Sequence, residues 1–183
     1  MVQATPVSFT EQWFGQDSQD NLAFLAYTQR KVPGALIEIG SWEGRSTVAF
    51  ANAANPRTVH AVDTWAGSPG EVSAELAAER DVFATFTANI AELTDGNVEV
   101  HRMGWREYVP TISEPVSLVF IDAEHTYIEV RDAIAALLPL LAPGGVICGD
   151  DVHHPPVIKA VCELLDPAQV EVKATLWIWR NPT

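Results

Sequence analysis

The segment ALIEIGSWEGRST, residues 35–47, combines an apolar run with a glycine-containing turn. Ala35 to Ile39 is almost continuously apolar, which is typical of a strand buried on both faces of a parallel sheet. Gly40 follows this run, and Gly44 precedes a predicted helix from Arg45 to Ala54. Glycine at both places lets the backbone pass close to a ligand. The segment therefore predicts a strand, a turn and a helix, with a ligand at the turn.

Apolar strands alternate with helices along the rest of the chain. Further strands are predicted at Thr58–Val62, Val98–Arg102, Val116–Ile121 and Val146–Cys148, with one or two more in Val170–Arg180. Helices are predicted at Asp17–Lys31, Glu71–Ile90, Tyr127–Leu141 and from Pro155 to about Leu165. This alternation predicts an α/β fold with a mainly parallel sheet and helices on both faces. We expect one domain over residues 1–183, with an N-terminal helical segment (1–33) and a core (34–183).

Composition narrows the classes of function. The chain is 48% hydrophobic and has 24 acidic against 11 basic side chains, a net charge of −13. Such a surface repels phosphate backbones, so nucleic acid is not an expected partner. No apolar stretch approaches about 18 residues, so no membrane span is expected. Residues 1–14 lack a basic region followed by an apolar run, which predicts a cytoplasmic protein without a signal peptide.

Polar residues follow the predicted strands. In parallel α/β sheets ligands bind beyond the carboxyl ends of the strands, so the residues at these ends are the candidates for a site. The candidate segments are Glu38–Gly44, Asp63–Trp65, Gly104–Trp105, Asp122–His125 and Asp150–His154. We expect them to meet in one cleft.

Residues at the first two strands distinguish between two cofactor classes. Asp63 ends the second strand, where a carboxylate can accept hydrogen bonds from ribose hydroxyls. A dinucleotide needs a second glycine for its pyrophosphate, and Trp42 occupies that position. S-adenosylmethionine (SAM) has no phosphate, and Glu38 is placed to help hold its ammonium group. The pattern therefore favours SAM over NAD.

Carboxylates gather at the fourth and fifth strands. Asp122 ends the fourth strand, and Asp150 and Asp151 end the fifth. Three carboxylates placed close together repel one another, so either their pKa values rise or a cation neutralises them. Oxygen ligands suit Mg²⁺, Mn²⁺ or Ca²⁺. His125 lies at the same edge and has an ordinary pKa that suits a general base.

The motifs EIGSWEGRST, AVDTW, LVFIDAEHTY and LLAPGGVICGDD, taken together and in this order, resemble class I SAM-dependent methyltransferases. The closest likeness is to the family-24 type, which includes metal-dependent O-methyltransferases that tailor antibiotic sugars. This resemblance implies a Rossmann-like fold with a seven-stranded sheet. It implies that Asp63 binds the ribose and that the Gly104–Trp105 turn lies beside the adenine. The whole implied cofactor site comprises Glu38, Gly40, Ser41, Gly44, Asp63, Thr64, Gly104, Trp105 and Asp122.

The resemblance also implies a reaction. His125 would take the proton from a small-molecule hydroxyl, of sugar or natural-product type. Asp122, Asp150 and Asp151 would hold Mg²⁺ or Mn²⁺, which acidifies a coordinated hydroxyl. The loop Thr64–Gly70 is rich in Gly, Ser and Pro, and we hypothesise that it is a lid over the cleft.

Other interpretations of these residues remain. The protein could be a SAM methyltransferase that needs no metal and acts on another acceptor such as a nitrogen, a nucleotide-binding oxidoreductase, or a non-catalytic SAM-binding protein. Asp122, Asp150 and Asp151 could instead cap helices, and His125 could have a structural role. The oligomeric state is open, and exposed sheet edges together with Trp177 and Trp179 could form a homodimer contact.

Overall fold

A computed structural model describes residues 9–182 of the chain; residues 1–8 of the predicted N-terminal segment and Thr183 lie outside the described part. Its sheet has seven strands in the order β3-β2-β1-β4-β5-β7-β6. Strands β1 to β5 pair in parallel, whereas β7 is antiparallel to both β5 and β6. The predicted mainly parallel, seven-stranded, Rossmann-like sheet is confirmed. The strands are β1 (Ala35–Ile39), β2 (Val59–Asp63), β3 (Val98–Arg102), β4 (Val116–Ile121), β5 (Leu141–Gly149), β6 (Glu171–Lys173) and β7 (Leu176–Arg180).

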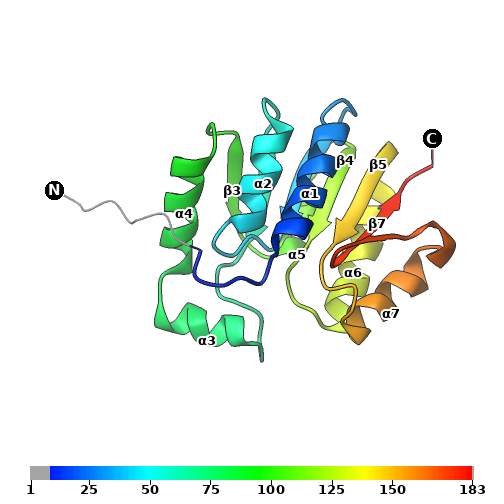
Figure 1. The fold of residues 1–183 in the computed structure, drawn as a ribbon. Helices are drawn as coiled ribbons and strands as arrows, with labels where there is room; N and C mark the ends of the chain where they lie inside the picture. Colours follow the sequence, from blue (N-terminus) through cyan, green and yellow to red (C-terminus); the bar gives the residue numbers. More distant parts are fainter. Residues whose placement is uncertain (1–8, 183) are drawn as a thin grey trace.

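Helices cover both faces of this sheet (Figure 1). One face carries α1, α2 and α4, and the other carries α5, α6 and α7, as the core clusters show. The short helix α3 has no buried residue and lies beyond the carboxyl ends of the parallel strands (Figure 1). The helices are α1 (Gln16–Gln29), α2 (Arg45–Ala54), α3 (Val72–Glu79), α4 (Val82–Leu93), α5 (Trp105–Tyr108), α6 (Tyr127–Leu137) and α7 (Pro155–Leu164).

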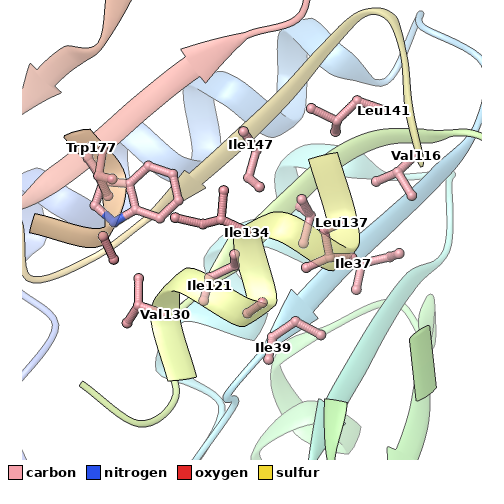
Figure 2. Packing of buried hydrophobic residues seen from close by; sticks show 14 of the residues in the cluster. Ile37, Ile39, Val116, Ile121, Val130, Ile134, Leu137, Leu141, Ile147 and Trp177 are labelled. Carbon is pink, nitrogen blue, oxygen red and sulfur yellow. The ribbon is translucent and has the colours of Figure 1, made fainter. Parts of the chain in front are cut away.

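Alternate residues of the central strands enter two separate cores. Leu118 and Phe120 of β4 face α1 and α2, whereas Val119 and Ile121 face α6 and α7. Every residue of β1 and β4 is buried, which explains why both strands are nearly continuously apolar in sequence. Figure 2 shows the second core, in which residues of α6 lie against the central strands and Trp177.

The predicted helix Glu71–Ile90 is in fact two helices, α3 and α4. Arg80 between them is extended, with φ −145° and ψ 157°. Asp81 then starts α4, because its side chain accepts a hydrogen bond from the backbone N–H of Ala84 at 2.9 Å. Composition and periodicity did not reveal this new start.

The fifth strand is longer than predicted, and the helix before it is shorter. Helix α6 ends at Leu137, followed by a single 3₁₀ turn, Leu138–Leu140. Strand β5 begins at Leu141, which pairs with Val116 of β4. The pairing register then shifts between Val116 and Leu118, so β5 passes through its Pro-Gly-Gly sequence without ending.

The predicted contribution of Trp177 to a dimer surface is wrong. This residue of β7 is 1% exposed, and its side chain packs in the core against α6 and α7. The homodimer therefore stays a prediction without this residue. In the described part of the chain, no helix has the length and apolar character that crossing a membrane requires.

Replacing Trp177 by alanine is expected to lower the free energy of unfolding by about 3–5 kcal/mol, because it empties a large buried site. Urea denaturation followed by circular dichroism measures the loss. Phe24→Ala is the matched control, since Phe24 is 63% exposed on α1, and it should change stability by less than about 0.5 kcal/mol. Equal losses in the two variants would contradict the described core.

Candidate functional site

A cavity of about 880 Å³ lies at the carboxyl ends of the parallel strands. It is lined by most of the residues that the sequence singled out, namely Gly40, Ser41, Asp63, Thr64, Gly104, Trp105, Asp122, His125, Asp150 and Asp151. Glu38 and Gly44 do not line the cavity. The candidate segments after the strands therefore meet in one cleft, as predicted.

The glycines of the first turn are required by packing within the chain. Gly40 has φ 89°, and a side chain there would overlap with the backbone carbonyl of Asp122. Gly44 has φ 88° and precedes α2, with the ring of Phe86 against it. Gly40 thus lets the end of β1 approach the end of β4 closely. This approach brings the turn next to Asp122.

Glu38 is a fully buried acid directly beneath this turn. Its Oε2 accepts hydrogen bonds from the hydroxyls of Ser41, at 2.7 Å, and Thr47. Its Oε1 has no hydrogen-bond partner among residues 9–182. Burial raises the pKa of Glu38 to about 7, although the hydroxyl hydrogen bonds oppose the rise. A buried acceptor without a donor is suited to a cationic group bound at the turn.

Asp63 joins the first two turns of the site. Its Oδ2 accepts hydrogen bonds from the backbone N–H groups of Ser41, at 2.8 Å, and Trp42, at 2.9 Å. Its Oδ1 accepts from the N–H of Trp65 at 2.7 Å. Both tryptophans have positive φ, 47° and 55°, which few residues other than glycine adopt. Asp63 therefore holds two strained turns beside the cavity, a role that sequence spacing did not reveal; ribose binding stays a prediction.

Asp122, His125 and Asp151 form a compact cluster at the cavity rim. Their side-chain ligand atoms all lie within 4.8 Å of one another. His125 Nε2 is 2.9 Å from Asp151 Oδ2 and 3.6 Å from Asp122 Oδ1. The alternative in which Asp122 caps the next helix is wrong, because Thr126 caps α6 with its hydroxyl.

Charge within this cluster is shared between the acids and the imidazole. Burial raises the pKa of Asp122, although His125 opposes the rise. Burial also disfavours the charged form of His125, but Asp122 and Asp151 outweigh it and raise its pKa to about 11. The imidazole is thus held as a cation. An imidazolium cannot accept a proton, so His125 can act as a base only when another positive charge balances the two carboxylates.

Asp150 lines the cavity but points to a different partner. Its Oδ1 accepts a hydrogen bond from the hydroxyl of Thr175, which in turn contacts Ser18 Oγ at 2.8 Å. Burial and the charge of Asp122 raise the pKa of Asp150 to about 7. Asp150 is not in the cluster of ligand atoms defined above. Metal binding by Asp150 stays a prediction. In the structure His125, and not Asp150, is grouped with Asp122 and Asp151.

Glu71 is a site residue that sequence analysis missed. It precedes α3, and its Oε1 accepts a hydrogen bond from the backbone N–H of His125 at 3.1 Å. Its Oε2 lies 3.2 Å from His125 Nδ1. The imidazole is thus held on one side by Glu71 and on the other by the two aspartates. Residues 64 and 66–69 of the predicted lid line the cavity, and Glu71 fastens the end of this loop to His125.

The N-terminal segment also borders the cavity, which sequence analysis did not predict. Arg80 lies 2.5 Å from Glu11 and 3.1 Å from buried Glu43 of the glycine turn. The backbone N–H of Thr10 donates to Glu43 at 2.7 Å. These contacts hold the segment before α1 against the turn, where Phe9, Glu11, Trp13 and Phe14 line the cavity.

Residues 37–152 match the sequence model of methyltransferase family 24, described as a methyltransferase domain. Because this match covers more than half of the chain, the chain belongs to that family. Its class is that of the SAM-dependent methyltransferases, as the sequence predicted. The interpretation as a nucleotide-binding oxidoreductase is therefore wrong. No curated protein sequence matches the chain.

Solved structures with the same fold include several methyltransferases. The O-methyltransferase NovP is 22% identical with a TM-score of 0.66, over 91% of this chain and 80% of that one. The O-methyltransferase TomG from Streptomyces achromogenes is 18% identical with a TM-score of 0.63, over 89% and 79%. The calicheamicin methyltransferase CalS11 is 17% identical with a TM-score of 0.62, over 91% and 80%. At these identities the likeness establishes the fold.

Glu71→Ala is expected to speed amide hydrogen exchange at His125 by about tenfold or more, because it removes a charged acceptor. Exchange followed by NMR measures the change. Glu75→Ala is the control, since Glu75 is exposed in the first turn of α3, and it should leave this amide unchanged. Identical exchange at His125 in both variants would show that Glu71 does not hold the histidine.

Proposed function

We propose that the protein transfers the methyl group of SAM to a hydroxyl oxygen of a small molecule, with the help of a divalent cation. The observation that carries this proposal is the cluster of Asp122, His125 and Asp151 at the rim of the cavity that begins at the glycine turn. Methyl transfer to oxygen requires removal of a proton from the hydroxyl. Binding of both reactants in one cleft, with a group that can take the proton, provides this chemistry.

The residues around the glycine turn fit SAM. The cavity volume lies within the range of roughly 300–1,000 Å³ that is usual for small-molecule sites. Glu38 is buried beneath the turn with its Oε1 unpartnered, and in its ionised form it would attract the ammonium end of the cofactor. Trp42 stands where a dinucleotide needs glycine. TomG, which shares the fold, was crystallised with SAM.

The cluster at the rim fits a divalent cation. Two carboxylates and an imidazole already converge there, and carboxylate oxygens are the ligands that Mg²⁺ and Mn²⁺ prefer. His125 Nε2 is buried and has no properly directed hydrogen bond, despite its short distance to Asp151. A cation bound to Asp122 and Asp151 would acidify a coordinated hydroxyl. It would also balance their charge, leaving His125 neutral and able to accept the proton.

His125 and Glu71 have complementary roles in this scheme. His125 accepts the hydroxyl proton at Nε2, the nitrogen nearer to the two aspartates. Glu71 lies at Nδ1 and keeps the ring in this orientation. The loop before Glu71 lines the cavity and shields the reacting groups from water when it closes.

The acceptor proposed here is a small molecule, such as a sugar or a related natural product. A net charge of −13 is unfavourable for binding nucleic acid. NovP and TomG are described as O-methyltransferases, and CalS11 as a TDP-rhamnose 3'-O-methyltransferase. Their acceptors differ, so the likeness supports the class of acceptor and not one compound.

Asp151→Asn is expected to weaken the binding of Mn²⁺ by about tenfold or more, because it removes a charged ligand. Isothermal titration of MnCl₂ in the presence of S-adenosylhomocysteine measures the affinity. Glu124→Gln is the matched control, since Glu124 lines the same cavity outside the cluster, and it should bind Mn²⁺ as the wild type does. Absence of binding by the wild type would remove the cation from the proposal and favour a metal-free methyltransferase.

The affinity for SAM is expected to rise by up to about 25-fold from pH 5.5 to pH 7.5, because a carboxyl with a pKa of about 7 is about 3% ionised at the lower pH and about 76% ionised at the higher pH. A raised pKa keeps the carboxyl neutral at the lower pH, whereas the ionised form that attracts an ammonium is present above pH 7. Titration calorimetry at both pH values measures the change. Glu38→Gln should bind SAM more weakly, with a flatter pH profile. The same profile in both proteins would contradict a role for Glu38 in cofactor binding.

A further inference from the structure

A second group of metal-ligating side chains lies at the β3 edge of the sheet, away from the cavity. It consists of His60 of β2 and of Glu99 and His101 of β3. His60 is the register partner of Glu99, and Glu99 and His101 are two residues apart on the same strand. Side chains two apart in a strand point to the same face, so all three ligands gather on one face of the sheet. Neighbouring Val98 and Val100 point to the opposite face, where they pack toward α4.

The distances within this group are close to those between ligands of a tetrahedral metal ion. His60 Nδ1 and His101 Nε2 are hydrogen-bonded at 3.1 Å. Glu99 Oε2 is 3.7 Å from His60 Nδ1, and Glu99 Oε1 is 3.5 Å from His101 Nε2. With Zn–N and Zn–O bonds of about 2.0–2.1 Å, two tetrahedral ligands are separated by about 3.3 Å. The separation of the two imidazole nitrogens is close to that value, and one ligand atom from each of the three residues lies within 4.8 Å of the others. Small movements of the side chains would therefore suffice to bind an ion.

The surroundings of the two histidines also fit a metal site. The His60 and His101 side chains are only 22% and 18% exposed, and the Tyr108 ring packs against both. Glu99 is 59% exposed and leaves a path from solvent.

We propose that His60, Glu99 and His101 form a Zn²⁺ site with three protein ligands and an open fourth position for water. Two imidazoles and one carboxylate suit zinc, whereas the cluster at the cavity, with two carboxylates, suits Mg²⁺ or Mn²⁺. This site does not depend on methyl transfer, because none of its ligands lines the cavity.

A zinc ion here would join the edge strand β3 to β2. Both strands lead to the cavity, since β2 ends at Asp63 and β3 is followed by the Gly104–Trp105 turn. A ligand that binds only the folded chain raises its stability in proportion to the logarithm of the ligand concentration. Zinc should therefore stabilise this edge of the sheet and the two cavity segments that follow it.

Isothermal titration of ZnCl₂ into the full chain, without cofactor, tests the site. Because the cluster at the cavity could also bind zinc, the titrations use Asp122→Asn/Asp151→Asn as the background. On this background we expect one zinc site and a zinc-dependent rise of the melting temperature. Adding His101→Gln should weaken the zinc affinity at least tenfold and abolish the rise. Adding His153→Gln, an exposed histidine outside both clusters, should change neither.

Glu99→Gln on the same background gives a second reading if the His101 variant fails to fold, because Glu99 is the most exposed of the three ligands. It should also lower the zinc affinity. Co²⁺ gives an independent signal, since tetrahedral coordination produces visible absorption bands that the ligand variants should lose. Zinc affinity that is unchanged by His101→Gln and Glu99→Gln, or absent on the background, would overturn the proposal.

Discussion

Two carboxylates at the ends of β4 and β5 share the imidazole of His125, and the chemistry of the site depends on this balance of charge. Asp122 and Asp151 stabilise the imidazolium strongly enough to raise the pKa of His125 to about 11. In that state the histidine completes an ion cluster and is not a base. In the function that we propose, a divalent cation at the carboxylates would take over this positive charge. The same residues would then form a closed ion cluster without the cation and a proton acceptor with it.

The scaffold brings this cluster next to the glycine turn that follows β1. Gly40 allows the end of β1 to meet the end of β4 at Asp122, a contact that a side chain would prevent. Asp63 fastens the turns after β1 and β2 to each other through three backbone N–H groups. Glu71 reaches from the loop before α3 to hold His125 from the other side. Each of these three residues therefore holds other parts of the site in place.

The sequence alone predicted most of the fold and the meeting of the candidate site residues in one cavity. Buried parallel strands such as β1 and β4 are continuous apolar runs, so their bounds matched the structure. Contacts between distant segments were not predictable. Glu71 meets His125 only because the chain before α3 passes over the carboxyl ends of the strands. The helix breaks at Arg80, where that residue forms ion pairs with Glu11 and Glu43. His60 and His101 come together only through the register of β2 and β3.

We propose that a cation bound by the two rim carboxylates frees the histidine beside the methyl donor. A crystal structure of the protein with S-adenosylhomocysteine and Mn²⁺ tests this proposal, because manganese is located by its anomalous scattering. We expect manganese on Asp122 and Asp151, with the cofactor in the same cavity and His125 no longer paired with both acids. A cofactor-bound crystal with no manganese there, and with His125 still between the carboxylates, would contradict it.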